Sequence, residues 1–464
     1  MKKIVCVFIV VLSFLRVDAQ KKMDGNQIDY RRSSLCLFMI DEDKMPQRDM
    51  IKNVFLGIPM PDKYNDHNIG TRIFSADSMT VTEEDIAAYR SAVLAGVAAE
   101  KAAKEQGNEG DGEKKKGGFG KMMGGLAKDV AKGVVSDATG GLVDTSNKEN
   151  YAVKAYKFLM EQKVAKQLFD RWFIDSEGGF STNLMQERGL YDASVIDAQT
   201  AKSSMKGDRM LRDAGKELVA NTFVVVTRYR YLSKDELVAE LEAAAKLIAE
   251  QAGGGVYGSL GAKAGGMALK ASLGDGYYVR TTSYLFQLNW NDTVYQKLGE
   301  VWENREAYDN ADFYGVNFIG KETAWSQVKA GIFSNKSEEE LIYIATVNAM
   351  DAVLAKLEKK HEVFKTKVPL LTVEPNFTAA IGMKEGLEPG DKFEVLEKIY
   401  NQETGETSYK RRGILKVSKD QLWDNRYKAD EERALSGTQQ DFKATRFEGK
   451  IKDAYVGMLL RQIK

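Results

Sequence analysis

The sequence predicts an α+β or α/β fold, in which helices pack on a mixed sheet and a small β-rich domain follows at the C-terminal end. Apolar runs typical of strands alternate with amphipathic helical stretches over most of the chain, and hairpin-like strand pairs occur only near its end. The chain has 464 residues, more than one hydrophobic core usually serves, so two or three domains are expected. Two stretches rich in glycine and alanine interrupt this pattern and are expected to be insertions.

The first residues have the pattern of a secretory signal peptide. The basic start Met1–Lys3 precedes an apolar run, Ile4–Leu15, and small or β-branched side chains follow at Val17 and Ala19. This arrangement predicts a signal peptide over residues 1–19 that is cleaved after the alanine. A membrane anchor is the alternative, but the apolar run is too short to cross about 30 Å of hydrocarbon.

The two cysteines, Cys6 and Cys36, bear on lipid anchoring and on disulfides. Cys6 lies inside the apolar run, too early for a lipid-modified cleavage site, so no lipid anchor is expected. Once the signal peptide is removed, Cys36 is the one cysteine left and cannot form an internal disulfide. It lies in the apolar run Leu35–Ile40 and is expected to be a small buried hydrophobe.

The charge balance argues against nucleic acid as a partner. The chain carries 67 basic and 67 acidic residues and has no formal net charge. Residues 1–19 contribute three basic residues and one acidic residue, which leaves the mature chain with a net charge of about −2. Nucleic-acid-binding proteins usually show a basic domain or face. A second apolar stretch long enough for a transmembrane helix is not found in the sequence.

Residues 20–106 are expected to form the first part of the α/β domain. Pro46 suits the first turn of a helix, and Thr82 followed by Asp85 resembles a capping box that begins a second helix. The expected elements are a strand over Ser34–Ile40, a helix from near Pro46 with Met50, Ile51, Val54 and Phe55 on one face, a strand over Thr71–Phe74, and a helix from Thr82 along Ile86, Tyr89, Val93 and Val97.

Residues 151–360 are expected to form the main part of the same domain. A helix over 151–173 is predicted from an apolar stripe with helical spacing, and capping-box patterns begin helices at Ser233 and Ser337. The stripe is Val153, Tyr156, Met160, Val164, Leu168 and Trp172. The other expected elements are a polar, mostly helical region over Ser181–Gly215, strands over Asn221–Leu232, Tyr277–Trp290 and Phe313–Phe318, and a helix over Asp292–Glu306.

The first insertion, residues 107–150, combines a polar loop with an apolar stripe. Residues 107–118 contain no apolar side chain, cannot offset the entropy cost of ordering, and are expected to be mobile. The stripe that follows, with lysines among its polar residues, is typical of a helix on a membrane surface. Its candidate membrane or partner contacts are Phe119, Met123, Leu126 and Val130.

The second insertion, residues 253–276, carries glycines spaced four residues apart. Small residues at this spacing let helices pack closely, as they do in membranes. Its candidate contacts are Gly254, Gly258, Gly261 and Gly265. For both insertions the alternative is a flexible loop beside a poor helix, because glycine costs up to about 1 kcal/mol per helical position relative to alanine.

The sequence contains no catalytic motif, so no catalytic residue, metal or cofactor is predicted. His67 and His361 are far apart, and neither stands in a metal-ligand spacing. We interpret His67, with Asp62 and Asp66 near it, as an ordinary surface group. A glycosidase needs two carboxylates in one cleft, but acidic runs such as Glu338–Glu340 are explained equally well by the helix macrodipole.

Residues 361–464 are expected to form a small β-rich domain around a hairpin. The hairpin strands are predicted over Lys392–Tyr400 and Thr407–Val417, with a loop over Asn401–Glu406. A turn motif precedes the first strand. In it, Gly386 and Gly390 permit tight turns, and Asp391 can hydrogen-bond the turn backbone.

The run Ile381–Val395, which contains this turn motif, resembles an element of the small C-terminal β-domain of flagellar assembly protein T and of related domains of curli-secretion-type proteins. The order of a helix, Gly215–Leu218 and the strand Asn221–Leu232 is similar to the α/β domain of curli-secretion proteins. These are bacterial envelope assembly families without enzymatic activity, and curli-secretion domains carry membrane-inserting hairpins. The resemblance implies analogous insertions here, although this chain lacks a lipobox cysteine and the alternating pattern of membrane hairpins.

These patterns together predict an exported, non-catalytic structural, assembly or interaction protein of the bacterial cell envelope, in the periplasm or at the outer-membrane periphery. Other envelope proteins are the expected partners, with membrane-surface contact through the insertions. Two alternatives stay open. One is a secreted hydrolase that acts on glycans through a carboxylate pair, and the other is a ligand-binding module whose aromatic strand Tyr277–Trp290 lines a sugar site. The sequence specifies neither the partner nor the oligomeric state.

Export gives the first testable prediction. Protein recovered from the envelope fraction should begin at Gln20, because Val17 and Ala19 suit the small side-chain sites that signal peptidase recognises. N-terminal sequencing measures this start, and Ala19→Arg should abolish cleavage at that position. An intact Met1 on protein from the soluble cytoplasmic fraction would contradict export.

Overall fold

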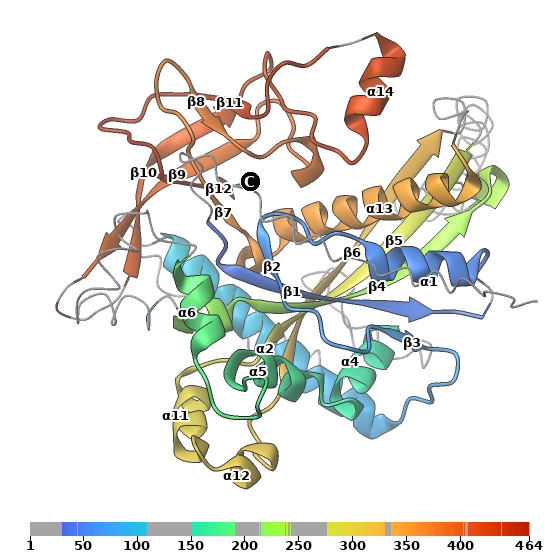
Figure 1. Ribbon diagram of the computed structural model, residues 1–464, viewed down its shortest axis with the longest axis vertical. Helices are drawn as coiled ribbons and strands as arrows, with labels where there is room; N and C mark the ends of the chain where they lie inside the picture. Colours follow the sequence, from blue (N-terminus) through green and yellow to red (C-terminus); the bar gives the residue numbers. More distant parts are fainter. Residues whose placement is uncertain are drawn as a thin grey trace, which may run out of the picture.

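The computed structural model describes residues 30–108, 151–190, 213–242, 276–329 and 336–463, apart from a few positions within these ranges. The described residues form two six-stranded sheets, and most of the helices pack on the first sheet (Figure 1). The predicted α+β class is confirmed.

The first sheet is mixed. Strand β1 runs parallel to β2, β3 and β4, whereas β5 pairs antiparallel with both β4 and β6. The strand order is β2-β1-β4-β5-β6, with β3 also beside β1. The bounds are β1 Ser33–Asp41, β2 Tyr64–Asp66, β3 Ile73–Ser75, β4 Thr222–Leu232, β5 Gly276–Leu288 and β6 Val316–Lys329.

Helices cover both faces of this sheet, which explains why β1 is apolar without alternation. Alternate side chains enter two cores: Cys36, Phe38 and Ile40 enter one, and Leu35, Leu37 and Met39 enter the other. The first core lies under α2 Glu83–Asn108, α4 Tyr151–Glu161, α5 Val164–Phe173, α6 Asn183–Leu190, α11 Asp292–Val301 and α12 Arg305–Asp309 (Figure 1). The second lies under α1 Arg48–Gly57 and α13 Glu338–Lys360. Cys36 is buried as predicted, and burial raises the pKa of its thiol to about 12.

The predicted capping boxes are present. In α2, Thr82 Oγ1 accepts from Asp85 N at 3.2 Å, and Asp85 Oδ2 accepts from Thr82 N at 2.8 Å. Ser337 and Glu340 exchange the same pair of bonds at the start of α13, at 3.2 Å and 3.0 Å. These bonds satisfy N–H groups that have no partner within the helix, so both starts are determined locally.

The helix predicted over 151–173 is wrong as a single element. It is divided into α4 and α5 because Lys163 adopts a left-handed conformation with φ of 49°. Met160, a member of the predicted apolar stripe, is 41% exposed near the end of α4. The helix predicted over Asp292–Glu306 is likewise divided into α11 and α12.

Strand β6 is longer than the predicted Phe313–Phe318, because it pairs with β5 along the whole length of that strand up to Lys329. The two insertions, 107–150 and 253–276, lie outside the described residues, except that α2 continues to Asn108 and β5 begins at Gly276.

The second sheet is antiparallel and occupies the C-terminal region, with the order β7-β12-β9-β10-β11-β8. Strands β9 and β10 have the predicted bounds. The strands are β7 Lys367–Pro369, β8 Phe377–Ala379, β9 Lys392–Tyr400, β10 Thr407–Val417, β11 Thr445–Glu448 and β12 Leu459–Ile463, and helix α14 spans Ala429–Ser436. This sheet has its own apolar core and lies on the α13 side of the first sheet (Figure 1).

A cluster of charged and phenolic groups joins the two sheets. Glu217, just before β4, accepts from Lys367 Nζ at 3.2 Å and from Tyr409 Oη at 3.0 Å, and its carboxylate lies 3.6 Å from Arg32 Nε. Lys367 belongs to β7 and Tyr409 to β10. Burial alone would raise the pKa of Glu217, but Lys367 and Arg32 outweigh burial and lower that pKa to about 2.

Acid should therefore weaken this junction. The Glu217 pKa is lowered in the folded state from its ordinary 4.5, so its stabilisation is complete above that pH and is lost as the pH falls toward 2. Glu217→Gln should lower the free energy of unfolding at neutral pH by on the order of 2–3 kcal/mol and should flatten its decline in acid. Urea denaturation at several pH values measures both effects. The exposed Glu300→Gln is the control, and identical acid profiles for the two variants would contradict this role of Glu217.

Candidate functional site

A cavity of about 420 Å³ lies where β6, α13 and the segment before β9 meet. Its volume is in the range of small-ligand pockets. Strand β6 contributes Trp325, helix α13 contributes Asp351 and Lys359, and the segment before β9 contributes Met383 and Lys384. We call this the inter-sheet cavity.

Glycines fix the segment before β9 against α13. The short helix η3, Met383–Glu385, ends at Gly386, which has φ of +70°, a conformation that favours glycine. A Cβ atom on Gly386 would lie 3.1 Å from the Ala355 side chain. A larger residue at position 386 would therefore be strained and would press on α13.

The other residues of the turn motif complete this contact. Gly390 has φ of +92°. Asp391 Oδ2 accepts from Glu388 N at 3.1 Å, and it also accepts from Lys359 Nζ of α13 at 3.2 Å and from Gln462 Nε2 of β12 at 3.0 Å. Asp391 thus links the turn, α13 and the second sheet at one edge of the cavity.

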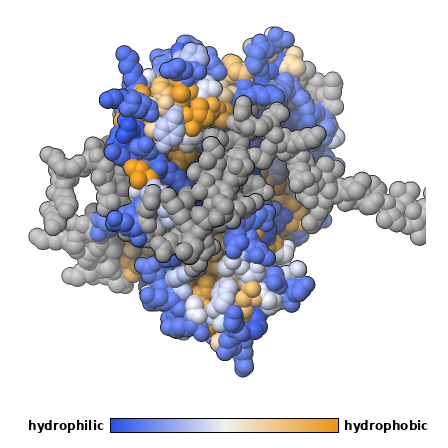
Figure 2. Space-filling model, turned by 60° about the vertical axis from the view of Figure 1, so that its left-hand side comes forward, coloured by the Kyte–Doolittle hydropathy of each residue, from blue (hydrophilic) through white to orange (hydrophobic). Residues whose placement is uncertain are grey.

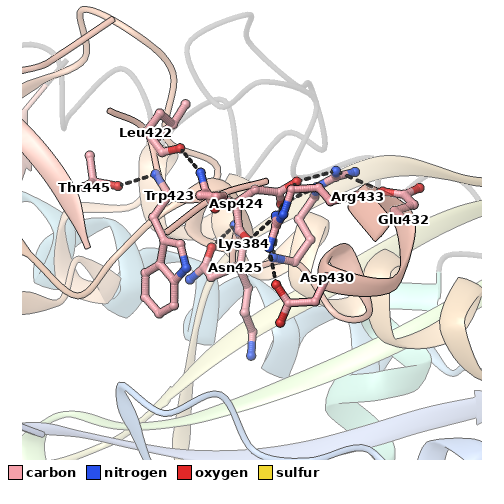
Figure 3. A network of polar contacts seen from close by, with 11 residues as sticks. Lys384, Leu422, Trp423, Asp424, Asn425, Asp430, Glu432, Arg433 and Thr445 are labelled. Atoms are coloured by element: carbon pink, nitrogen blue, oxygen red, sulfur yellow. Dashed lines mark hydrogen bonds and ion pairs between the residues drawn. The ribbon is translucent and has the colours of Figure 1, made fainter. Parts of the chain in front are cut away.

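A polar network supports the same segment from the opposite side (Figure 3). Lys384 N donates to Asn425 Oδ1 at 2.8 Å, Asn425 Nδ2 donates to Glu385 Oε2 at 2.8 Å, and Trp423 N donates to Thr445 Oγ1 at 3.0 Å. These bonds use the backbone of Lys384. Its side chain extends away from the network in Figure 3 and lines the cavity.

Asp351 is the least satisfied group in the cavity wall. Its Oδ2 atom is buried and has no hydrogen-bond partner among the described residues. Burial raises the pKa of Asp351 to about 7. Lys384 has the largest effect among the surrounding charges, and it opposes that rise only in part. Near neutral pH this carboxyl group exists in both its protonated and its ionised form.

Lys384 is the second group left without compensation. Three other cations that line the cavity have carboxylate partners: Lys356 lies 3.6 Å from Glu322, Lys359 lies 3.2 Å from Asp391, and Arg426 donates to Asp424. Lys384 has no ion pair in the described part of the chain. Its ammonium group is therefore available to a ligand.

Two apolar side chains are exposed in the same cavity. Trp325 is 40% exposed and Met383 is 39% exposed. The guanidinium group of Arg280 lies 5.6 Å from the centroid of the Trp325 ring, which fixes that ring from one side. An exposed tryptophan and an exposed methionine beside uncompensated polar groups are features of recognition surfaces.

A second cavity, of about 360 Å³, lies between the α4–α5 turn and α12. Its Lys166 is already paired with Asp170 at 2.9 Å and with Asp309 at 3.0 Å. Because the charge of Lys166 is already neutralised by these carboxylates, the second cavity has fewer unpaired polar groups for a ligand than the inter-sheet cavity has.

The sequence-based candidates have different outcomes. Gly386 lies in the wall of the inter-sheet cavity and Gly390 and Asp391 lie next to it. The candidate contacts of the two insertions, from Phe119 to Val130 and from Gly254 to Gly265, lie outside the described residues.

The interpretation of His67 as a surface group is wrong. Its side chain is fully buried, stacks on Trp172 with ring centroids 4.8 Å apart, and bonds to Leu168 O at 3.1 Å. Arg188 donates to the other ring nitrogen at 2.8 Å. Burial and the neighbouring Arg188 hold the pKa of His67 well below its usual value, so this histidine is a neutral structural group. His361 packs against Gly320, where a Cβ atom would lie 2.2 Å from its ring.

Sequence reasoning did not identify Asp351, Lys384 or Trp325. One signal was present: Asp351 is the one charged residue between Leu341 and Ala355, within a helix that is otherwise apolar or neutral over this stretch. Burying a lone carboxyl group in such a helix costs free energy, so a functional role is one explanation for its presence. Lys384 lies within the run Ile381–Val395, but its own residue type gave no reason to single it out, and Trp325 lies beyond the predicted strand Phe313–Phe318.

Among the described residues, no group of three His, Cys, Asp or Glu side chains could hold a metal ion. None of the described helices is both long and apolar enough to cross a bilayer. Comparison of the chain with family models and with curated proteins found no match. The chemistry of the inter-sheet cavity therefore carries the functional argument.

The raised pKa of Asp351 predicts a stability cost at high pH. The folded state holds this proton more tightly than the unfolded chain, so stability falls as the pH rises from the ordinary 3.8 toward 7. Asp351→Asn should remove this decline and raise the free energy of unfolding at about pH 8 by on the order of 2–3 kcal/mol. Urea denaturation at about pH 5 and pH 8 measures the difference. The largely exposed Asp49→Asn is the control, and a destabilised Asp351→Asn protein at the higher pH would contradict the burial cost.

Proposed function

We propose that the protein is an exported, non-catalytic interaction or assembly component of the bacterial cell envelope, in the periplasm or at the outer-membrane periphery. In this proposal it recognises its partner through the inter-sheet cavity. The observation that carries the proposal is the combination of exposed Trp325 and Met383 with uncompensated Asp351 and Lys384 in one cavity.

The sequence supports the location. Residues 1–19 have the pattern of a cleaved signal peptide. The run Ile381–Val395 resembles an element of flagellar assembly protein T, and part of this run forms the cavity wall. The segment that carries the resemblance is thus also a segment that a partner would contact.

The surface supports local recognition rather than a broad apolar interface. In the view of Figure 2 most of the coloured surface is hydrophilic, and the hydrophobic colour is broken into separate areas in the upper and lower parts. Large exposed hydrophobic side chains of the described part come from many elements, among them Leu56, Tyr295 and Ile414. Trp325 and Met383, by contrast, share one cavity, which concentrates apolar contact area at a single point.

A secreted glycan-acting hydrolase is the second candidate, because the same cavity holds two carboxyl groups with different environments. The pKa of Asp351 is about 7, which suits a general acid, and Glu388, between Gly386 and Gly390, is exposed. Glycosidases use such a pair, one residue as acid and the other as base or nucleophile. Hydrolysis of cell-wall glycans that is lost in both Asp351→Asn and Glu388→Gln would favour this candidate over the first.

The proposal predicts which surface captures the partner. The purified wild-type protein, used as bait on solubilised envelopes, should retain at least one envelope protein. Trp325→Ala should reduce that capture at least about ten-fold, since buried aromatic anchors of interfaces are worth about 2 kcal/mol or more. Met383→Ala should also reduce it, because it removes the neighbouring apolar contact. Tyr295→Ala, which removes an aromatic side chain of similar exposure on α11, should leave capture unchanged. Capture that is equal for all three variants would contradict recognition through the cavity.

A further inference from the structure

Cations outnumber carboxyl groups in the inter-sheet cavity. Lys356, Lys359, Lys384 and Arg426 line it, against Asp351 and Glu388. Three of these cations are neutralised by carboxylates, as described above. Lys384 remains without an ion pair among the described residues. Its charge acts on Asp351, and Glu388 is exposed to solvent, so the charge balance beside Lys384 changes with the form that Asp351 takes.

The charged groups around Asp351 come from several elements. Lys384 and Glu385 belong to η3, and Lys63 and Asp62 precede β2; Lys384 and Lys63 favour ionisation, whereas Glu385 and Asp62 oppose it. Asp351 in turn acts on the charge state of Tyr229, from β4, whose buried hydroxyl group has no hydrogen-bond partner among the described residues. These influences partly cancel, so burial prevails and the neutral form persists to near-neutral pH.

A protonated Asp351 changes what the cavity can bind. It is then a hydrogen-bond donor rather than an anion, and Lys384 has no internal counter-ion in the described part of the chain. Both groups then favour a ligand that is an anion and a hydrogen-bond acceptor. When Asp351 ionises, its carboxylate neutralises Lys384 from within and repels such a ligand.

We infer that the inter-sheet cavity binds an anionic group, a carboxylate or a phosphate, carried on an apolar or aromatic ligand that packs on Trp325 and Met383, and that binding is coupled to protonation of Asp351. This inference deepens the proposed function and rests on the inter-sheet cavity being its recognition site. Lys384 holds the anion, Trp325 and Met383 hold the apolar part, and Asp351 makes the affinity depend on pH.

Simple probes test the anionic preference. Isothermal titration of the purified protein at about pH 6 should show benzoate or phenyl phosphate binding, with benzyl alcohol and benzylamine at least about ten-fold weaker. Tighter binding of phenyl phosphate indicates a phosphorylated natural ligand, and tighter binding of benzoate indicates a carboxylate. Benzylamine binding more tightly than both anions would overturn the inference.

Variants then assign the groups. Lys384→Met should weaken benzoate at least about ten-fold, whereas Lys419→Met, an exposed lysine outside the cavity, should not. If the Lys384→Met variant melts at a lower temperature than the wild type, Lys384→Gln is measured in its place. Lys384 variants that bind benzoate as tightly as the wild type would overturn the inference.

The pH profile isolates Asp351. For the wild type, benzoate affinity should fall on the order of ten-fold between about pH 6 and pH 8.5, because the ionised form competes for Lys384. Asp351→Asn should bind as tightly at the higher pH as the wild type does at the lower, with a flat profile. A flat wild-type profile, or an unchanged slope in Asp351→Asn, would overturn the coupling.

Failure of the two proposals can be told apart. Anion binding without capture of any envelope protein would contradict the proposed function and leave the anion site standing. Capture that requires Trp325, together with no binding of benzoate or phenyl phosphate, would uphold the function and overturn the anion site.

Discussion

Helix α13 must pack on two neighbours at once, and this constraint determines how the two sheets meet. Its apolar side chains, among them Ile342, Ala349 and Val353, enter the core above the first sheet. Its other side approaches the segment before β9 closely: a Cβ atom at Gly386, which has a positive φ, would lie 3.1 Å from the Ala355 side chain. Helix α13 meets the first sheet through a continuous hydrophobic core, but it meets the C-terminal region at separate contacts. These are the Gly386–Ala355 approach, the Lys359–Asp391 ion pair and the Tyr343–Tyr427 ring contact, and a cavity is left beside them.

Two carboxyl groups near this junction show how the same burial leads to opposite protonation states. Glu217 has Lys367 and Arg32 within ion-pair distance, and its pKa is lowered to about 2. Asp351 has no such partner, and its pKa is raised to about 7. Desolvation acts on both, so the number and nearness of cations decide the sign. Ionised Glu217 therefore stabilises the folded protein, whereas ionisation of Asp351 lowers the free energy of unfolding.

Local sequence patterns were sufficient for much of the fold. The capping boxes at Thr82 and Ser337 specify helix starts through contacts three residues apart, and the apolar run Leu35–Ile40 predicted the strand that β1 forms. What local patterns missed depends on tertiary contacts. The break between α4 and α5 requires a left-handed conformation at Lys163, and the sequence has no glycine or proline there to indicate it. Strand β6 is long because it pairs with β5 along its whole length.

The candidate site was harder to predict for the same reason. Its residues come from β6, α13 and η3, and each looks ordinary in its own segment. His67 illustrates the opposite error: flanking aspartates suggested a surface, whereas Trp172 and Arg188, more than a hundred positions later, enclose it. Only the turn motif at Gly386 and Gly390 led from sequence to the cavity, since its glycines are required by backbone conformation.

The carboxyl group of Asp351 is not what the stability of the fold alone would favour at this position. An apolar residue at position 351 would pack against the short helix η3 without the cost of burying a charge, and replacing uncompensated buried polar groups by apolar ones is often stabilising. Asp351 and the unpaired Lys384 instead line the same cavity without an ion pair between them, and Trp325 is exposed there as well. Natural proteins tend to retain such costs at functional sites. The arrangement is therefore better explained by a ligand that completes it than by the stability of the fold.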